Sequence, residues 1–369
     1  MQAIVDLLQE NVGTVYTAAA VEIRRRGAVL YRATVGNLDP QGRRTGDSAS
    51  TRPDTMFDLA SLTKLFTSTA FFRLVDAGRV ALASPVQSLL PSFSGPRWIR
   101  PYPDPLVPGR YIEVVPPTDG FADAGSVTFR QLLTHSSGLP AWINLHEAED
   151  EPARREMCLK TSFAYPTGTR VVYSDVGFIL IGMAIERLTD RPLDEAMTML
   201  VTRPLDLAIR YGPIAAGNVA PTEICPWRQR RLVGEVDDEN SATLHGVAGH
   251  AGLFGTLRDL STLGQLFLAD GGGFISPRLA RESIRRHIDD RGLGWHLHSA
   301  EGSPDGHFFS EASFGHTGFT GTSLWMDPQR QLLCALLTNR VFFGRDPEAI
   351  TQFRPFFHDT LIEALEGRP

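Results

Sequence analysis

Strand-like sequence lies at both ends of this 369-residue chain, and helical periodicity fills the middle. Near the N-terminus, residues 17–24 and 28–35 alternate small or apolar residues with polar ones on either side of a short Arg- and Gly-containing turn, which predicts a β-hairpin. Near the C-terminus, strand patterns cover residues 292–298, 308–314, 318–326 and 331–338. The sequence therefore predicts an α+β protein with one sheet formed from both ends of the chain.

Helical periodicity occupies most of the chain between these strands. From Phe57 to Gly78 apolar residues recur at helical spacing, and the glycine is typical of a position just past a helix end. Further helical segments, including one at each terminus, cover residues 1–10, 128–134, 175–189, 192–201, 257–269, 277–288 and 355–366. We expect residues 1–60 and 290–369 to form an α/β domain with an antiparallel sheet, and residues 61–289 to form an inserted, mostly helical domain.

A proline-rich stretch interrupts the helical part. Residues 90–117 contain eight prolines and show little periodicity. This composition predicts a long irregular surface loop or insertion. The sequence leaves open whether the insertion forms one wall of a groove or only decorates the surface.

Charge and cysteine content exclude several classes of partner. The formal net charge is −6 and the basic residues are scattered, so nothing predicts binding to nucleic acid or to an anionic membrane. Cys158, Cys225 and Cys334 lie far apart and in no paired spacing, which predicts buried, reduced thiols and neither a disulfide framework nor a zinc ribbon. No run of eighteen apolar residues occurs, so we expect no membrane span.

The N-terminal sequence bears on the compartment. Residues 1–10 carry an acidic residue early and resemble the start of an amphipathic helix, not a basic segment followed by an apolar one as in a signal peptide. On this sequence we expect a cytoplasmic protein, or a periplasmic or secreted one if a signal peptide has been removed. The oligomeric state is not predicted.

Lysine is almost absent from the chain. Of 36 basic residues 34 are arginines, and one of the two lysines, Lys64, follows Ser61 by three positions. Arginine effectively never loses its proton, whereas a lysine amine whose pKa is lowered can accept one from a hydroxyl. At this spacing both side chains share one face of a helix, and the helix N-terminus adds about half a unit of positive charge, which favours an alkoxide and lowers the lysine pKa. We predict Ser61 as nucleophile and Lys64 as its base; the other lysine, Lys160, is interpreted as a surface charge.

A second polar segment, Tyr173-Ser174-Asp175, precedes the helical pattern of residues 175–189. Asp175 is interpreted as the N-cap of that helix. A phenol at Tyr173 that faces Lys64 could take the Ser61 proton and pass it to a leaving group, as general base and then general acid. The alternative is that Tyr173 only packs, as tyrosines ahead of helices often do; the presence of Ser61 and Lys64 favours the catalytic interpretation.

The third segment is a glycine-spaced run, residues 315–321, in a strand region. Glycine in a strand often marks a place where a ligand or another backbone approaches closely. The backbone N–H of Phe319 could therefore form an oxyanion hole together with the N–H of Ser61.

Taken in order, Ser61-x-x-Lys64, Tyr173-x-Asp175 and His316-Thr317-Gly318 resemble the three motifs of the serine β-lactamase and penicillin-binding protein superfamily. The branch that looks most similar is the class C β-lactamase-related serine hydrolases, which include esterases and D-Ala-D-Ala carboxypeptidases. Residues 128–140 and 246–255 support the resemblance, which runs through nearly the whole chain except the proline-rich stretch.

The resemblance implies roles for individual residues. Ser61 would be acylated, Lys64 would accept its proton, Tyr173 would act as general base and acid, and the backbone amides of Ser61 and Phe319 would form the oxyanion hole. It also implies a β-lactamase/transpeptidase-like fold, in which an antiparallel sheet is flanked by helices and a mostly helical domain is inserted. The active site would lie in the groove between the two parts.

The motif positions that would face the substrate, Asp175, His316, Thr317 and Gly318, include two departures from the antibiotic-hydrolysing pattern. Many members have an asparagine that donates to a substrate carbonyl where this chain has Asp175, which when ionised only accepts. Many have a lysine that binds the substrate carboxylate where this chain has His316, which is mostly neutral near pH 7 at its ordinary pKa of about 6.5. Losing a charge-assisted contact of roughly 1.5–3 kcal/mol predicts weak selectivity for carboxylate-bearing substrates such as β-lactams.

We therefore predict a serine acyl hydrolase with esterase activity or weak amidase or carboxypeptidase activity. Its partner would be a small-molecule ester, amide or β-lactam. The alternatives are a β-lactamase or D-alanyl-D-alanine carboxypeptidase proper, and a non-turnover penicillin-binding or sensing protein, because acylation without efficient deacylation needs the same motifs.

The remaining conspicuous residues have weaker interpretations. Two histidine pairs could chelate zinc, but no cysteine or glutamate completes an evident tetrahedral set, so we expect no metal and no cofactor. These pairs are His245 with His250 and His296 with His298. His135 is interpreted as a hydrogen-bonded core or loop residue. Arg340 could either supply the cation that is missing near His316 or lie on the surface at a strand end.

Overall fold

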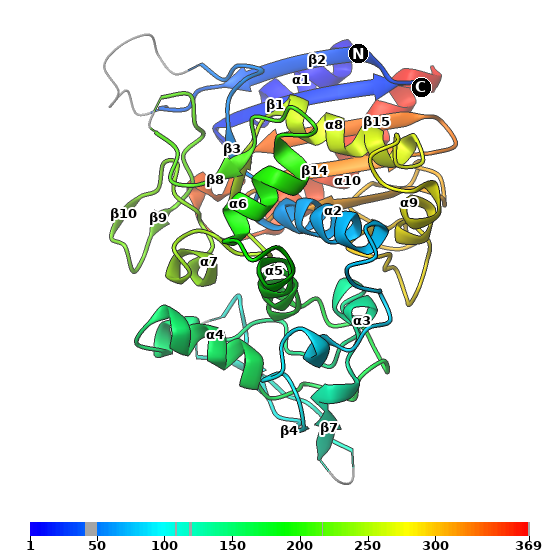
Figure 1. Cartoon of the computed structure of the whole chain (residues 1–369). Helices are drawn as coiled ribbons and strands as arrows, with labels where there is room; N and C mark the ends of the chain where they lie inside the picture. Colours follow the sequence, from blue (N-terminus) through cyan, green and yellow to red (C-terminus); the bar gives the residue numbers. More distant parts are fainter. Residues whose placement is uncertain (41–49, 108, 118–119, 216, 368–369) are drawn as a thin grey trace.

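The computed structural model describes residues 1–40, 50–107, 109–117, 120–215 and 217–367. Within them, a six-stranded antiparallel sheet has the order β12-β13-β14-β15-β1-β2 (Figure 1). Its strands are β1 (Ala18–Arg25), β2 (Ala28–Gly36), β12 (His296–Leu297), β13 (Phe314–Thr317), β14 (Ser323–Asp327) and β15 (Leu332–Thr338). The prediction of one sheet formed from both ends of the chain is confirmed, because β1 pairs with β15 from Ala19 opposite Thr338 to Arg25 opposite Leu332.

Helices cover both faces of this sheet. Leu332, Cys334 and Leu336 of β15 pack with α1 (Gln2–Glu10) and α10 (Glu348–Glu366) on one face. The alternate β15 residues share an apolar cluster with α8 (Leu257–Leu268) on the other face (Figure 1). This period of two, with apolar residues on both faces, is what a central buried strand requires.

A glycine brings α8 close to the sheet. A Cβ at Gly264 would lie 2.6 Å from Leu333 Cδ1 and 2.9 Å from Met326 Sδ. No larger residue fits at this position without displacing these side chains, so the approach of the helix to β14 and β15 depends on glycine.

The C-terminal strands are shorter than predicted. Of residues 292–298 only β12 is a strand, since Gly294 adopts φ +78° and its Cβ would lie 2.2 Å from Ser68 Oγ of the neighbouring helix. Of residues 308–314 only the last belongs to β13, because the Asp327 carboxylate accepts hydrogen bonds from the backbone N–H and the hydroxyl of Ser310 and so holds a loop there. β14 begins at Ser323, after a turn that the Gly318 N–H closes on the Thr322 carbonyl.

The predicted helices are present, with some altered bounds. They are α2 (Thr63–Asp76), α3 (Phe129–Leu133), α5 (Asp175–Thr189), α6 (Leu193–Met197) with a π-turn at Thr198–Thr202, and α9 (Pro277–Ser283). α9 ends before residue 288, because the Ser283 carbonyl accepts a hydrogen bond from the Leu293 N–H instead of from a further helical turn. α10 begins at Glu348, seven residues earlier than predicted, and contains Pro355 in its interior.

Two helices were not predicted. α4 (Glu151–Lys160) begins after the N-cap Asp150 and has a proline in its first turn, which are recognisable start signals. α7 (Glu239–Thr243) is capped by Asp238, whose carboxylate accepts the Ser241 N–H. Both helices lie in segments that contain glycine, proline and charged residues, and their apolar periodicity is too weak to predict a helix.

The division of the chain at residue 289 is not a packing boundary. α8 lies within residues 61–289, yet it packs against the sheet because its apolar side chains share one cluster with β14 and β15. The same cluster continues through α2 to α5, and α4, β4 (Pro96–Trp98) and β7 (Phe121–Asp123) lie beyond α5 (Figure 1). The helical part and the sheet thus share a continuous core.

The proline-rich stretch is more regular than predicted. β4 pairs with β7, and β5 (Tyr102–Pro103) pairs with β6 (Tyr111–Ile112). A third small sheet, with the order β3-β11-β8, joins β3 (Phe57–Asp58) to β11 (Leu253–Gly255) and β8 (Arg210–Tyr211). Further small strands are β9 (Ile224–Cys225) and β10 (Arg230–Arg231), which pair with each other. Among the described residues, no helix has the length and apolarity needed to span a membrane.

Candidate active site

The nucleophile candidate lies just after β3. The chain leaves that strand at Asp58, adopts φ +46° at Ala60, and places Ser61 in the 3₁₀ turn Ala60–Leu62 that leads into α2. Left-handed backbone at an alanine is unfavourable and needs support from its surroundings. The Asp58 carboxylate gives such support by accepting the Ala60 N–H at 2.8 Å.

Lys64 is fully buried and meets three acceptors. Its Nζ lies 2.9 Å from Ser61 Oγ, 2.7 Å from Asp175 Oδ1 and 3.2 Å from the His250 carbonyl oxygen. The predicted contact between Ser61 and Lys64 is thus confirmed. A charged Lys64 thus donates to the Ser61 hydroxyl and the His250 carbonyl and forms an ion pair with Asp175.

The charge state of Lys64 differs from the sequence-based prediction. Burial alone would lower the pKa of Lys64, but the Asp175 carboxylate and the Tyr173 phenol together raise it above the ordinary value. The lowered lysine pKa that we predicted from the helix N-terminus is therefore wrong for this arrangement. The ion pair with Asp175, at 2.7 Å, outweighs the effects of burial and of the helix N-terminus on the pKa of Lys64 and keeps the lysine protonated.

Asp175 also differs in its local role. The N-cap of α5 is Ser174, whose hydroxyl accepts the Gly177 N–H at 3.2 Å, and Asp175 is the first helical residue. Our N-cap interpretation of Asp175 is wrong because its carboxylate turns toward Lys64 instead of toward the helix. The same carboxylate lines the cavity beside Ser61.

Tyr173 lies between Lys64 and a buried histidine. The Lys64 Nζ is 4.8 Å from the centre of the Tyr173 ring, and the His135 ring packs against the phenol with centroids 4.5 Å apart. Burial raises the pKa of Tyr173; Lys64 lowers it and Asp175 raises it, and the net change is upward. The phenol is therefore neutral at ordinary pH and can pass one proton on while it receives another.

His135 is a structural neighbour of Tyr173. It is buried, and its Nδ1 accepts the Ser174 N–H at 2.9 Å. Burial, and next to it the charge of Arg291, lowers the pKa of His135 well below its ordinary value, so the ring is neutral. The interpretation of His135 as a hydrogen-bonded core residue is confirmed, and its position fixes the backbone that carries Tyr173.

The loop after β13 is tied to the segment that precedes Ser61. Thr320 Oγ1 donates to the Asp58 carbonyl at 2.7 Å, and Thr322 Oγ1 donates to the Leu59 carbonyl at 3.1 Å. A Cβ at Gly318 would lie 2.6 Å from that same Leu59 carbonyl. Phe319 therefore lies beside Ser61, and among the described residues its N–H has no hydrogen-bond partner.

Two arginines hold this loop from behind. Arg354 of α10 donates to the carbonyls of Gly318 at 2.7 Å and Thr322 at 2.9 Å, and its burial lowers its pKa to about 9. Arg340 donates to the Phe319 carbonyl at 2.7 Å and lies over the Phe319 ring. The surface interpretation of Arg340 is wrong, because the side chain is 5% exposed and supports the loop.

Ser61 opens onto a cavity of about 470 Å³. Tyr173, Asp175, His316, Thr317, Gly318 and Phe319 all line it, so the structure brings the predicted site residues together. His316 Nδ1 is 2.7 Å from the Thr317 carbonyl and so carries the proton of the ring. Burial, and then the charge of Lys64, lowers the pKa of His316 well below its ordinary value, so His316 faces the cavity uncharged.

Comparison with known proteins agrees with this geometry. A family model described as Beta-lactamase matches residues 5–354. The chain belongs to the beta-lactamase family. The resemblance drawn from the three motifs is thereby confirmed, and with it the expectation of an enzyme of the serine hydrolase type.

Two relatives in the beta-lactamase family illustrate its range. The N-acetylmuramyl-L-alanine amidase of Bacillus subtilis (strain 168) is 29% identical over 373 residues, which cover 90% of this chain and 79% of the relative. A Salmonella typhimurium protein, proposed to be a D-alanyl-D-alanine carboxypeptidase, is 30% identical over 322 residues, which cover 78% of this chain and 70% of the relative.

Solved structures confirm the β-lactamase/transpeptidase-like fold. EstCE1, described as a hydrolase with promiscuous acyltransferase activity, has a TM-score of 0.73 at 18% identity and covers 96% of this chain and 98% of its own. The octameric penicillin-binding protein homologue from Pyrococcus abyssi has a TM-score of 0.71 at 19% identity and covers 100% of this chain and 77% of its own. At these identities the likeness establishes the fold alone.

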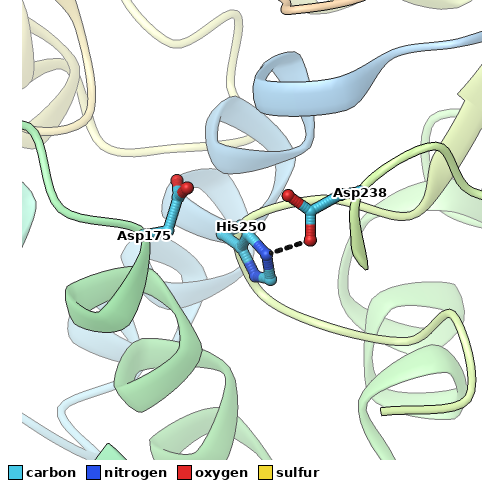
Figure 2. Close-up of side chains that lie close together, drawn as sticks. All are labelled: Asp175, Asp238 and His250. Atoms are coloured by element: carbon cyan, nitrogen blue, oxygen red, sulfur yellow. Dashed lines mark hydrogen bonds and ion pairs between the residues drawn. The ribbon is translucent and has the colours of Figure 1, made fainter. Parts of the chain in front are cut away.

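Within this beta-lactamase family site, three acidic and imidazole side chains converge next to Lys64. Figure 2 shows His250 between Asp175 and Asp238, with His250 Nε2 bonded to Asp238 Oδ1 at 2.8 Å. Burial would raise the pKa of Asp238, but His250 lowers it to about 2, so this carboxylate is ionised. A metal ion here would compete with the Lys64 ammonium for Asp175, so we assign the group to hydrogen bonding.

The other histidines proposed as ligands have carboxylate partners. His296 Nε2 lies 2.7 Å from Asp290, and His298 Nδ1 lies 2.9 Å from Asp305. His245 is exposed and lies 3.2 Å from Glu151.

Sequence reasoning missed several residues of the site. They are Asp58, Asp238, Arg291 and Arg354, together with His250, which the sequence analysis considers only as a possible zinc ligand. Asp58 lies inside the Ser61 motif and His250 lies inside the glycine-rich run 246–255, so the position of each within a motif could have identified it as a site residue. Arg354 lies in the last helix of the chain, where no local pattern links it to a loop more than thirty residues earlier.

Proposed function

We propose that this chain is a serine acyl hydrolase that works through an acyl-enzyme on Ser61, with esterase activity or weak amidase or carboxypeptidase activity. The observation that carries the proposal is the contact of 2.9 Å between Ser61 Oγ and Lys64 Nζ at the wall of a cavity of about 470 Å³. A hydroxyl next to a buried cation, open to a substrate-sized space, is what an activated serine requires.

In this mechanism Ser61 Oγ attacks the acyl carbon of the substrate. Because Asp175 keeps Lys64 protonated, we assign the proton transfer to Tyr173: its oxygen receives the Ser61 proton while its own proton passes to the leaving group. The Lys64 ammonium stabilises the developing negative charge on both oxygens. Lys64 is thus a cationic donor in the proposal and not the base that the motif alone predicted.

The oxyanion would be held by two backbone amides. We assign these to the N–H groups of Ser61 and Phe319, on the two segments that Thr320 and Thr322 tie together. This hydrogen bonding fixes the distance between the segments before substrate arrives, so little reorganisation is needed during the reaction.

The substrate side favours a neutral or weakly anionic group. Asp175 and the uncharged His316 replace the amide donor and the cation that the motif family uses for β-lactams. We therefore propose that esters and simple amides are better substrates than penicillins.

A carboxypeptidase activity is the second candidate, and Arg291 favours it. Arg291 lines the cavity, and its guanidinium carbon lies 5.7 Å from the centre of the Tyr173 ring. An arginine there could bind the carboxylate of a C-terminal amino acid as leaving group. The names of the Bacillus subtilis and Salmonella typhimurium relatives, which act on amide bonds by those names, are consistent with this candidate.

Intact-mass measurements test the proposal. We expect a fluorophosphonate to add one adduct to the wild-type chain and none to Ser61→Ala, and short-chain p-nitrophenyl esters to be hydrolysed faster than nitrocefin. A penicillin adduct that persists for hours would indicate a penicillin-binding receptor instead. Efficient nitrocefin hydrolysis without ester hydrolysis, or labelling that survives Ser61→Ala, would contradict the proposal.

A further inference from the structure

Asp58 occupies an unusual place directly behind the nucleophile. It is 2% exposed, lies at the end of β3 and precedes Ser61 by three residues. One carboxylate oxygen accepts the Ala60 N–H at 2.8 Å, and the other accepts the Asp237 N–H at 2.7 Å. The carboxylate thus bridges the turn before Ser61 and the loop before α7.

The bridge supports the strained residue of the turn. Ala60 has φ +46°, a conformation that only glycine adopts readily, and its N–H points to the Asp58 carboxylate. The direction of the Ser61 N–H and side chain follows directly from the backbone angles of Ala60. Removing the acceptor would leave a buried N–H without a partner and free Ala60 to return to an ordinary conformation.

With Ser61 as the proposed nucleophile, we propose that Asp58 is a positioning residue. Its ionised carboxylate holds Ala60 in the left-handed conformation and so places Ser61 next to Lys64 and Phe319. Asp58 does not line the cavity and acts through the backbone alone. The loop before α7 is also held through its backbone by Arg228, which donates to the carbonyls of Val236 and Asp237.

The charge of this carboxylate depends on pH. Burial raises the pKa of Asp58 to about 6, against the opposing effect of the two backbone N–H groups. Protonation turns one carboxylate oxygen into an O–H donor and a weaker acceptor, so one of the two N–H groups then loses its charge-assisted partner. The neighbouring carboxyl is Asp237, whose pKa is raised to about 7. The charged groups that face Asp58 and Asp237 from the adjoining loops and strands are Asp238, Arg228, Glu223, Arg340 and Arg345.

The test compares Asp58→Asn with a matched control, Asp259→Asn. Asp259 is also buried and also accepts two backbone N–H groups, those of Ala208 and Thr256, both at 2.8 Å, but it caps α8 away from the cavity. The asparagine at position 58 keeps one acceptor oxygen but presents an N–H₂ group to a backbone donor. The readouts are the rate of fluorophosphonate labelling of Ser61 between about pH 5 and pH 9, and the melting temperature.

We expect wild-type labelling to fall as the pH drops through about 6. Asp58→Asn should slow labelling about 10- to 100-fold at pH 8, the effect of a displaced nucleophile, and should lose this fall at low pH. Asp259→Asn should lower the melting temperature at least as much, yet label within about twofold of wild type with the low-pH fall intact. Wild-type labelling and pH dependence in Asp58→Asn would overturn the proposal.

A second measurement does not depend on the variants or on labelling. Amide hydrogen exchange of the wild-type chain should show Ala60 and Asp237 losing protection below about pH 6, relative to Ala208 and Thr256. If the four amides respond alike, Asp58 does not hold the turn by its charge. If Ser61 is never labelled in the wild type, the acyl hydrolase proposal fails, while the exchange still decides whether Asp58 positions Ala60.

Discussion

The groups that set the position of Ser61 are bonded within the protein, whereas other residues of the site keep polar atoms without a partner among the described residues. Lys64 has three partners and Asp58 two, and Phe319 is held through its carbonyl. In contrast, His316 Nε2 has no partner among the described residues, and Leu106 of the proline-rich stretch lines the cavity while its side chain is 59% exposed.

This difference separates two tasks. Groups that must be placed precisely for bond making are fixed before substrate arrives, because a small displacement would cost much of the rate. Groups that select the substrate are left to bond with it. Substitutions on the first side should therefore alter rate for every substrate, and those on the second should alter preference.

The largest effect is expected at Lys64. Lys64→Ala removes the only buried cation that contacts Ser61 Oγ among the described residues, so acylation should fall about a thousandfold or more for every substrate. Lys160→Ala is the matched control, since Lys160 is the only other lysine and is half exposed on α4. Stopped-flow acylation rates with esters and fluorophosphonates provide the measurement. A fall confined to one substrate class would show that Lys64 is not part of the fixed side.

Asp175 belongs to both sides, which makes Asp175→Asn informative. Removing the carboxylate should lower the pKa of Lys64 and supply an amide donor to the cavity. We expect penicillin acylation to rise about tenfold and the activity optimum to move to lower pH. Nitrocefin and ester kinetics across a pH series measure both changes. An unchanged ratio of the two rates would contradict the role of Asp175 in substrate preference.

A change at Arg291 should act on selection alone. In Arg291→Gln, the ratio of kcat/KM for a carboxylate-bearing ester to that for its neutral methyl ester should fall about threefold to tenfold, because a charge-assisted contact near Tyr173 is lost. The ratio corrects for any general loss of activity. If both esters lose rate equally, Arg291 supports the catalytic side instead.

The smallest effect on rate is expected at Asp237, where the change should appear in stability. Burial raises the pKa of Asp237 from 3.8 to about 7, so the native state keeps a proton that the unfolded chain releases near pH 4. This contribution to stability is complete below about pH 4 and is lost as pH rises to about 7. Relative to Asp237→Asn, the wild type should lose up to about 1.4 kcal/mol per pH unit in that range by denaturant unfolding. A constant difference would show that the carboxyl is not neutral when folded.

Much of the fold followed from periodicity, and much of the site from spacing. The apolar run of residues 331–338 and the helical stripe of residues 175–189 identify β15 and α5 because each pattern reports burial along a single element. Ser61 and Lys64 meet as predicted because three residues make about one helical turn.

What the sequence did not reveal depends on contacts between distant segments. The charge of Lys64 is set by Asp175, more than a hundred residues away, so the local helix field gave the wrong direction for its pKa. Arg340 looked like a residue at a strand end, and only the return of the chain over Phe319 shows why it is buried. The loop at residues 308–313, where the sequence predicts a strand, likewise depends on Asp327 in a neighbouring strand.

The scarcity of lysine has a practical consequence. Lys64 is fully buried and Lys160 is half exposed, so a reagent that couples to primary amines meets one accessible lysine besides the N-terminal amine. Lys160 is not among the residues that line the cavity. The protein can therefore be tethered to a solid support through α4 in a nearly uniform orientation, with the cavity beside Ser61 left open.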